Sequence, residues 1–263
     1  MQYSNNISVV IRCKNDPRVF DCISSIDIPA EVVVSYSGQS DLKSKIEQTG
    51  AICVNAPYNN LSVVSNIGLN TATGDLLVLT DSDTLFEPGC LRKLIQELKR
   101  TEIVKAKTRF LSVPGNIISE TIAAARDYVN SLPVVYTPGI ALRKDVIEKI
   151  QGFFFNEVVP FAVDADLNFR VKYSDVSVSF LDNAYIRHLP VDIKDDFRAA
   201  FRIGKGCEKS IRYWNMKGAL GHLRSSELKG VKISMLPDLA KKKGIFALLY
   251  QIVWDLLYWL GDS

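Results

Sequence analysis

Paired cysteines are missing from this sequence. The chain has 263 residues, and its five cysteines are scattered and include no Cys-x-x-Cys pair. An odd number of isolated cysteines argues against a disulfide framework and a structural zinc site, and is expected of a protein in the reducing cytosol. The first residues also lack a basic start followed by an apolar run, so no signal peptide is expected.

Two common phosphate-binding loops are absent as well. Neither Gly-x-Gly-x-x-Gly nor the Walker A pattern occurs, and this excludes two frequent ways of binding a nucleotide. Histidine is almost absent, with only His188 and His222 in the chain. We expect His222 at the surface, whereas His188 follows a predicted strand and is considered below as a metal ligand.

The composition is that of an ordinary globular protein, with 47% hydrophobic and 23% charged residues. One large domain, or a domain with an extension, is expected at this length. The charge is uneven, because residues 194–243 hold 13 Lys and Arg against 5 Asp and Glu while the whole chain carries only +3. This basic segment predicts an anionic partner, for which membrane headgroups, a phosphorylated ligand and nucleic acid are candidates.

Apolar runs alternate with helical segments in the first 110 residues. This alternation predicts an α/β fold with a mostly parallel central sheet that helices cover on both faces. Strands are predicted at 7–11, 31–35, 51–54, 76–79 and 102–107, and helices at 16–26, 41–48, 62–71 and 88–100. Asp16 with Pro17 is expected to open the first helix, and Ser62 to cap the third.

The second half of the chain is less regular. Helices are predicted at 117–130, 144–150, 164–172 and 192–214, and strands at 134–142, 176–181 and 185–189. The last of these helices is long and basic.

Two carboxylates, Asp81 and Asp83, directly follow the predicted strand 76–79. In open α/β sheets, ligands bind beyond the carboxyl ends of the strands. A bend there would let both carboxylates address one hard cation, which prefers oxygen ligands and often shares its shell with a substrate phosphate. The alternative is an ordinary turn in which Asp makes local hydrogen bonds, since Asp-x-Asp is a weak motif by itself.

Five segments in a fixed order resemble the family 2 glycosyltransferases of GT-A fold. They are residues 9–15, residues 66–83, residues 137–143 with 152–153 and 156–157, residues 163–170, and residues 186–188. The resemblance covers about residues 7–190. It implies a GT-A catalytic domain over 1–190, with a nucleotide-binding half (1–110) and an acceptor half (111–190), followed by a basic helical extension over 191–263.

The resemblance implies a metal-dependent, inverting enzyme that moves a sugar from a UDP- or GDP-sugar to a hydroxyl of a glycan or lipid-linked glycan. Asp83, Asp81 and His188 are the implied ligands of Mn²⁺ or Mg²⁺, and Asp164 is the implied general base. The implied contacts to the nucleotide-sugar are Arg12, Lys14, Ser37, Asn66, Asp81 and Ser82. Without the resemblance, Asp164 is an ordinary candidate for a helix N-cap, and Arg12 and Lys14 belong to a solvated loop.

Three positions depart from the family pattern. Residues 36–41 lack the acidic pair that commonly contacts the base, so the base is not predicted. Ser65 occupies a position where the family often has Arg, so one contact to the diphosphate must come from another residue. Val163 occupies a position where the family usually has Glu. Two alternatives therefore stay open. One is a catalytically inactive nucleotide-sugar-binding or scaffold protein, and the other is a sugar-phosphate nucleotidyltransferase, although residues 15–17 supply no Gly-rich basic loop.

The C-terminal segment 241–261 begins with three lysines and continues as an apolar, aromatic helix. Its apolar part is near the lower length limit for a spanning helix, and the central Asp255 is costly in hydrocarbon. A peripheral helix at the inner face of the cell membrane is therefore expected. The alternatives are packing on the body of the protein or on a second copy in a homodimer. No nucleic-acid-binding module accompanies the basic residues, so nucleic acid is not expected as a partner.

Overall fold

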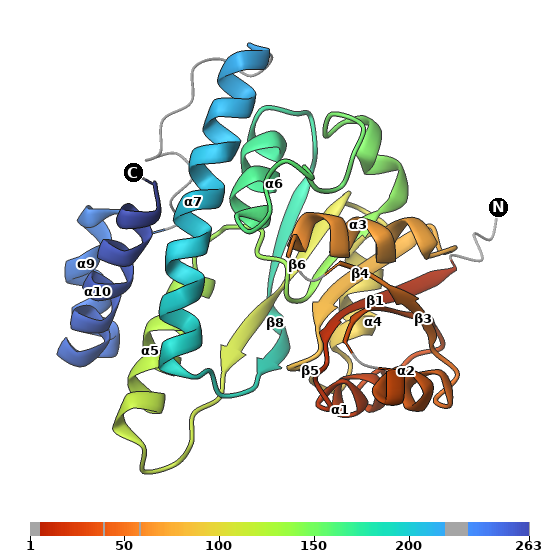
Figure 1. Cartoon of the computed structure of the whole chain (residues 1–263), viewed down its shortest axis with the longest axis horizontal. Helices are drawn as coiled ribbons and strands as arrows, with labels where there is room; N and C mark the ends of the chain where they lie inside the picture. The colour runs from red at the N-terminus through yellow and green to blue at the C-terminus, as the bar shows by residue number, and fades with distance from the viewer. Residues whose placement is uncertain (1–5, 39, 58, 219–230, 263) are drawn as a thin grey trace.

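The computed structural model describes residues 6–38, 40–57, 59–218 and 231–262, and His222 lies outside these ranges. Within them, one eight-stranded sheet runs through the molecule in the order β3-β2-β1-β4-β7-β6-β8-β5 (Figure 1). The strands are β1 (Ile7–Lys14), β2 (Glu31–Ser37), β3 (Ile52–Asn55), β4 (Leu76–Asp81), β5 (Thr84–Phe86), β6 (Ile103–Phe110), β7 (Ile140–Arg143) and β8 (Val178–His188).

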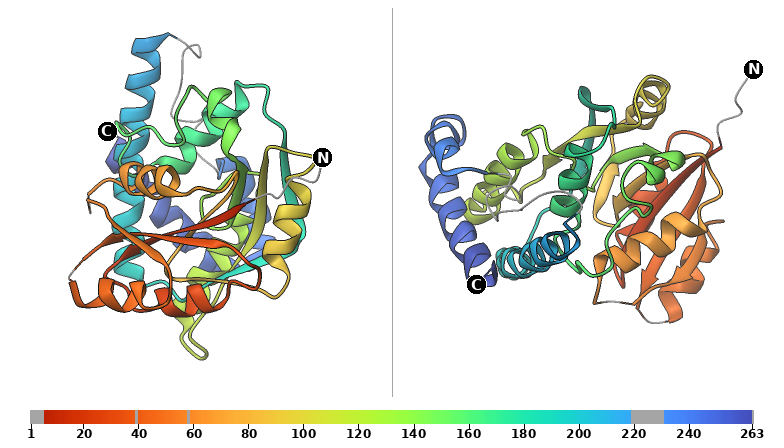
Figure 2. Two further views of the ribbon diagram at one scale, coloured as in Figure 1. Left: turned by 90° about the vertical axis from the view of Figure 1, so that its right-hand side faces the viewer. Right: turned by 90° about the horizontal axis from the view of Figure 1, so that it is seen from above.

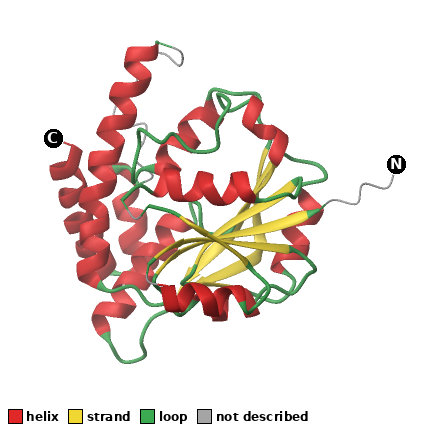
Figure 3. Cartoon of the chain, turned by 45° about the vertical axis from the view of Figure 1, so that its right-hand side comes forward, coloured by secondary structure: helices red, strands yellow, loops and turns green. Residues whose placement is uncertain are grey.

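Helices pack above and below the sheet, and a further group gathers along one side of it (Figure 3). The helices are α1 (Val19–Ser24), α2 (Ser40–Glu47), α3 (Leu61–Thr71), α4 (Cys90–Glu97), α5 (Ile117–Asn130), α6 (Val163–Lys172), α7 (Ile193–Lys217), α9 (Leu236–Lys243) and α10 (Ile245–Asp262), with 3-10 turns η1 (Lys144–Glu148) and η2 (Ile233–Met235). In the described part of the chain, no helix combines the length and apolar character that crossing a bilayer requires.

The first four strands form the predicted parallel half of the sheet. β1 pairs in parallel with β2 and with β4, and β2 pairs in parallel with β3. Val9, Val10 and Ile11 are buried on both faces of β1, which explains the continuous apolar run in the sequence. The register sets Arg12 opposite Asp81, so the carboxyl ends of β1 and β4 lie side by side.

The other half of the sheet is mixed, and here several boundaries predicted from the sequence were wrong. β7 is antiparallel to both β4 and β6, and it covers only the end of the predicted strand 134–142. The earlier part of that segment is a loop, because the Asn168 side chain binds the N–H and the C=O of Val135 in place of a neighbouring strand. The predicted strands 176–181 and 185–189 are one strand, β8, with an irregularity where it pairs with β6.

Two helix starts also differ from the prediction. The cap of α3 is Asn60 rather than Ser62, since Asn60 Oδ1 accepts from the N–H groups of Ser62 and Val63. α1 begins only at Val19, although the Asp16 carboxylate accepts from the Arg18 N–H just before it, and the same carboxylate also binds the side chains of Arg18 and Ser82. The helix predicted at 144–150 is only the 3-10 turn η1 (Lys144–Glu148), whereas the helices predicted at 164–172 and 192–214 are confirmed as α6 and α7.

The C-terminal helices pack on the body of the protein (Figure 2). Asp166 of α6 accepts hydrogen bonds from Ser210 and Trp214 of α7, at 2.8 and 2.7 Å, and all three residues are buried. These bonds join the segments on either side of the predicted boundary at residue 190. The division of the chain at that boundary stays a prediction.

Helices α7 and α10 cross at very short range. A Cβ atom on Gly204 would lie 1.9 Å from the carbonyl oxygen of Tyr258, and a Cβ on Gly261 would lie 2.1 Å from that of Phe201. Both positions therefore require glycine for this crossing. The crossing fixes which face of α10 points toward the body.

Candidate active site

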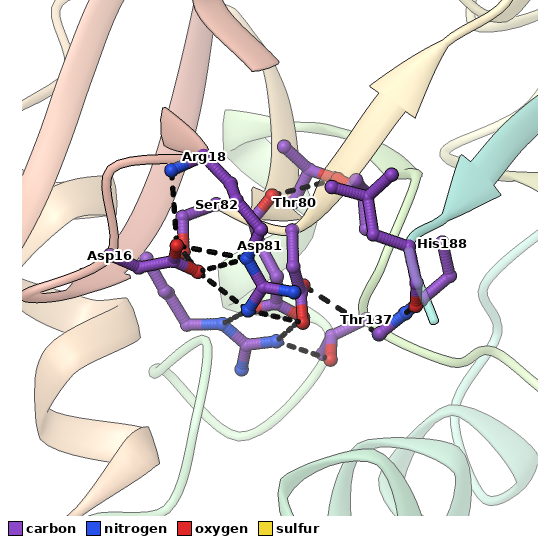
Figure 4. A network of polar contacts seen from close by, with 11 residues as sticks. Asp16, Arg18, Thr80, Asp81, Ser82, Thr137 and His188 are labelled. Carbon is purple, nitrogen blue, oxygen red and sulfur yellow. Dashed lines mark hydrogen bonds and ion pairs between the residues drawn. The ribbon is translucent and has the colours of Figure 1, made fainter. Parts of the chain in front are cut away.

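Asp81, labelled in Figure 4, is held by the buried side chain of Arg12. Arg12 Nε and Nη2 donate to the two carboxylate oxygens of Asp81 at 2.7 and 2.9 Å. Burial alone would lower the pKa of Arg12, but the ion pair with Asp81 outweighs it and the pKa is raised. The carboxylate predicted as a cation ligand is thus already paired with a cationic side chain of the protein.

The same arginine connects β1 to the loop before β7. Arg12 Nη2 also donates to Thr137 Oγ1 at 2.8 Å, and the main-chain N–H of Thr137 donates to Asp164 Oδ1 at 3.0 Å. Arg12 Nη1 lies 3.4 Å from Ser65 Oγ. The guanidinium of Arg12 therefore reaches Ser65, the position where the sequence departs from the family pattern. Thr137 couples Arg12 to Asp164, a link that no sequence motif pointed out.

Asp164 lies in the first turn of α6, but it does not cap that helix. The cap position belongs to Ala162, and the Asp164 carboxylate instead reaches Thr137. Burial raises the pKa of Asp164 to about 6, an effect that the charge of Arg12 partly opposes. A carboxylate that titrates near neutral pH is well suited to accept a proton from a substrate.

Asp83 and His188 are brought together by strand pairing. β5 runs antiparallel to β8, with Thr84 opposite His188, and the Leu189 N–H donates to the Asp83 carbonyl at 2.8 Å. His188 Nε2 lies 3.6 Å from Asp83 Oδ1. His188 Nδ1 lies 2.8 Å from the Leu189 carbonyl, so we assign the ring proton to Nδ1. Nε2 then presents its lone pair toward Asp83.

This pair fits a divalent cation. It offers one carboxylate oxygen and one imidazole nitrogen, and the imidazole is oriented by a backbone carbonyl as metal-binding histidines usually are. Burial raises the pKa of Asp83, and a bound cation would favour the ionised carboxylate. The described residues contain no group of three or more His, Cys, Asp and Glu side chains that could hold a metal ion. Water and substrate oxygens would complete the shell, as is common for Mg²⁺.

Ser82 and two further charged side chains complete this edge of the sheet. Ser82 is buried, and its Oγ donates to Asp16 Oδ2 at 3.0 Å. Arg18 Nη2 lies 2.8 Å from Asp16 Oδ2 and 3.6 Å from Asp83 Oδ2. Sequence reasoning missed Arg18, although its place just after β1 was a usable signal. We refer to Arg12, Asp16, Arg18, Asp81, Asp83 and His188 as the strand-end cluster.

Lys14 and Ser37 lie opposite each other where β1 and β2 end. Lys14 is exposed, and partial burial together with the charge of Arg202 on α7 lowers its pKa. Two cationic side chains thus approach each other beside the strand-end cluster. The Ser37 hydroxyl donates to the Ala56 carbonyl at 2.7 Å. The contacts predicted from Lys14 and Ser37 to a nucleotide-sugar stay predictions.

Asn66 is buried in α3, away from this edge. Its amide donates to the Phe155 carbonyl at 2.9 Å and to Glu157 Oε1 at 3.0 Å, and it accepts from the Phe155 N–H. The described contacts of Asn66 are thus to the loop that precedes α6. A role in donor binding, which stays a prediction, would act through that loop.

A pocket of about 430 Å³ extends from the strand-end cluster to the C-terminal helices. Asp83, Asp164 and His188 line one end of it. The opposite wall comes from α5, α7 and α10. The pocket therefore unites two of the three predicted cation ligands, Asp83 and His188, with the predicted base and the C-terminal extension, whereas Asp81 is not part of its lining.

The comparisons with known proteins agree with this architecture. The family model described as Glycosyl transferase family 2 matches residues 9–150. No curated protein sequence matches the chain. S. aureus TarS has a similar fold, with a TM-score of 0.55 and 15% identity over 97% of this chain and 54% of TarS. The chain thus spans about half the length of TarS.

Two other solved structures show the same fold. GalNAc-T7 with UDP, GalNAc and Mn²⁺ gives a TM-score of 0.59 at 12% identity, over 97% of this chain and 58% of that one. Glucosyl-3-phosphoglycerate synthase from Mycobacterium tuberculosis, with Mn²⁺, UDP and phosphoglyceric acid, gives 0.57 at 17% identity, over 79% of each chain. The predicted fold and family are confirmed. With the family model matching more than half of its residues, the chain belongs to glycosyl transferase family 2 and has the GT-A fold.

Proposed function

We propose that this protein transfers a sugar from a nucleotide-diphosphate sugar to a hydroxyl group, with Mn²⁺ or Mg²⁺ and with inversion at the anomeric carbon. The observation that carries the proposal is one pocket lined by the Asp83–His188 pair and by Asp164. TarS 1–349 has been solved with UDP-GlcNAc, and GalNAc-T7 with UDP and GalNAc. These relatives favour a UDP-linked hexose derivative over a GDP-sugar as the donor.

Asp83 and His188 would hold the cation, which when bound stabilises the negative charge of the leaving diphosphate. Asp81, fixed by Arg12, is left to orient the donor rather than to supply the main cation ligand. Arg18, Lys14 and Arg202 bring positive charge to the same edge, where a diphosphate would be attracted.

Asp164 would take the proton of the acceptor hydroxyl. Its carboxylate accepts from the Thr137 N–H and lines the pocket, where an acceptor hydroxyl could reach it. A single displacement assisted by one base inverts the anomeric carbon, so no covalent sugar–enzyme intermediate is needed.

The test is binding and hydrolysis of nucleotide-sugars. We expect UDP or UDP-sugars to raise the melting temperature only with Mn²⁺ or Mg²⁺, and the enzyme to release UDP slowly from the right donor. Asp83→Ala should abolish both effects. Asp182→Ala, which removes a fully exposed carboxylate, is the matched control and should change neither.

Each alternative gives a different result in this test. A scaffold protein would bind the nucleotide-sugar without turnover. A nucleotidyltransferase would form a nucleotide-sugar from a nucleoside triphosphate and a sugar phosphate. Absence of stabilisation by every nucleoside diphosphate, with either cation, would refute the proposal.

The proposal extends to a peripheral position at an anionic membrane leaflet, where a lipid-linked acceptor would be found. One face of α10 is exposed and apolar, and the lysines at the end of α9 precede it. The exposed side chains are Ile245, Phe246, Leu249, Ile252, Val253, Leu256, Trp259 and Leu260. Apolar residues beside cationic ones are typical of helices that lie in a membrane interface.

Liposome sedimentation tests this position. The full chain should sediment with vesicles that contain anionic phospholipid and less with neutral vesicles. Leu249→Gln with Leu256→Gln should reduce sedimentation, whereas Tyr173→Gln, which changes an exposed residue on α6's C-terminal side, should not. A dimer in sedimentation velocity that these α10 substitutions dissociate would instead assign the face to a second copy.

A further inference from the structure

The wall of the pocket farthest from the strand-end cluster carries polar groups among apolar ones. Gln251, Trp254 and Asp255 come from α10, Arg126 from α5 and Asp196 from α7. Gln251 is only 1% exposed, and its Nε2 donates to Asp255 Oδ1 at 2.9 Å. We refer to these five residues as the helical wall.

Two buried atoms of the helical wall have no hydrogen-bond partner among the described residues. They are Gln251 Oε1 and Trp254 Nε1. Gln251 Nε2 already donates a hydrogen bond to Asp255. The amide oxygen, Oε1, still needs a hydrogen-bond donor. The indole Nε1–H needs an acceptor. Leaving such buried groups unpaired is costly, so the structure favours a ligand that supplies both kinds of partner.

The charge of the pocket restricts that ligand. Its lining includes five carboxylates, from Asp83, Asp164, Asp195, Asp196 and Asp255. Arg126 is the one arginine or lysine among the described lining residues. It forms a buried ion pair with Asp196, and its guanidinium lies 4.6 Å from the Trp254 ring centroid. No positive charge of the described lining is therefore left for an anionic group on the acceptor.

We propose that the helical wall binds the acceptor, and that the acceptor presents uncharged hydroxyl groups there rather than a phosphate or carboxylate. A hydroxyl can donate to Gln251 Oε1 and can accept from Trp254 Nε1, whereas an ionised phosphate or carboxylate can only accept. The aromatic lining, which includes Tyr136, Phe161 and Trp254, suits the apolar face of a sugar ring or an apolar aglycone. This assignment rests on the proposed function, because it takes the sugar to be transferred at the Asp164 end.

The assignment separates this protein from one of its structural relatives. Glucosyl-3-phosphoglycerate synthase was solved with phosphoglyceric acid, a compound with two anionic groups. Such a compound would meet the five carboxylates of this pocket without a free cationic side chain in its described lining. Like-charge contacts of this kind are an effective means of rejecting a ligand.

An acceptor panel tests the class. With a donor that the enzyme hydrolyses, we expect transfer to 4-nitrophenyl glycosides of glucose, galactose and N-acetylglucosamine. Transfer to 3-phosphoglycerate and glucose 6-phosphate should be at least tenfold lower in kcat/KM. Asp255→Asn should reduce the difference in kcat/KM between the neutral and the anionic acceptors, because it removes one negative charge and keeps an oxygen that can accept from Gln251. Preference of the wild-type enzyme for the anionic compounds would overturn the assignment.

Substitution of Gln251 tests the position. Gln251→Met keeps the length of the side chain but removes the amide, and it should raise the acceptor KM about fivefold to tenfold. The donor hydrolysis rate, the affinity for UDP with Mn²⁺ and the melting temperature should stay unchanged. Leu249→Gln, on the exposed face of the same helix, is the control and should leave the KM of these soluble acceptors unaltered.

If the KM for the acceptor is unchanged in Gln251→Met, the acceptor does not bind at the helical wall and the proposal is refuted. A parallel loss of UDP affinity would also refute it, because that would indicate a structural role. The proposed function fails separately, if the wild-type chain binds no UDP with Mn²⁺. Titration calorimetry with the glycosides alone then still tests the pocket, and absence of heat would refute the acceptor assignment as well.

Discussion

The strand-end cluster and the helical wall face the same pocket but are built in opposite ways. The cluster stands where strands end, and its side chains already pair with one another, as Arg12 does with Asp81. The wall is made by helix faces, lies among apolar side chains of the pocket, and keeps Gln251 Oε1 and Trp254 Nε1 without partners in the described structure. The cluster is thus organised before any ligand binds, whereas the wall leaves hydrogen bonds for the ligand to make.

This difference indicates which substrate each region suits. Charged side chains held in a fixed geometry suit a ligand whose structure does not vary, such as a diphosphate with its cation. A few unpaired polar atoms among apolar side chains suit a ligand that the protein must distinguish from other compounds. Substitutions in the two regions should therefore affect different steps.

Loss of Asp83 should have the largest effect and should act on the cluster alone. Asp83→Ala removes the carboxylate of the Asp83–His188 pair, so transfer should fall about a thousandfold or more, since a bound cation is worth several kcal/mol in such reactions. The measurement is kcat/KM for transfer alongside UDP affinity with Mn²⁺. Retained cation-dependent UDP binding would contradict the assignment of Asp83.

Substitution of Asp164 should slow the transfer step without weakening donor binding. Asp164→Asn keeps an oxygen for the Thr137 N–H but removes the base, so kcat should fall about a hundredfold to a thousandfold. UDP affinity with Mn²⁺ should stay within about twofold of the wild-type value. A variant that transfers sugar at the normal rate would show that another group takes the proton.

Breaking the Arg12–Asp81 pair should cost stability as well as activity. Arg12→Met leaves Asp81 and Thr137 without their buried partner, and the free energy of unfolding should fall by about 3 kcal/mol. Arg143→Met removes an arginine from an exposed pair with Asp145 and should cost less than about 1 kcal/mol. Chemical denaturation measures both. Equal losses would mean that Arg12 does not organise the cluster.

The pH dependence should give the smallest and most specific effect. Burial raises the pKa of Asp164 to about 6, and a base must be ionised to accept a proton. The transfer kcat/KM should therefore rise as the pH increases through about 6, and fall about tenfold per unit below it. The residual activity of Asp164→Asn should lack this limb. A limb that persists in the variant would belong to another group.

The fold was largely predictable from sequence, because β1 to β4 are continuous apolar runs separated by helices. The order of β7, β6 and β8 was not, since β7 is a short strand antiparallel to β4 and β6, while β8 pairs in parallel with β6, and no local pattern signals this mixture. The mixed pairing depends on contacts between segments far apart in the chain, such as Ile103 with Leu142 and with Val178.

The candidate site was predictable where it coincides with a motif. Asp83, Asp164 and His188 follow from the family resemblance, and the structure places all three at one pocket. The role of Thr137 as a link was not predictable, because it depends on one hydroxyl and one N–H that point to two different elements. Gln251, which lines the same pocket, was not among the predicted site residues.

The two kinds of bond made by Thr137 limit which substitutions evolution can accept at this position. Its main-chain N–H donates to Asp164, and nearly every residue except proline would preserve that bond, but its hydroxyl also interacts with the Asp164 carboxylate. Its bond from Arg12 comes from the hydroxyl, so only serine would preserve that one readily. Serine is therefore the replacement at position 137 that would keep all of these contacts, whereas most other residues would keep only the main-chain bond to Asp164.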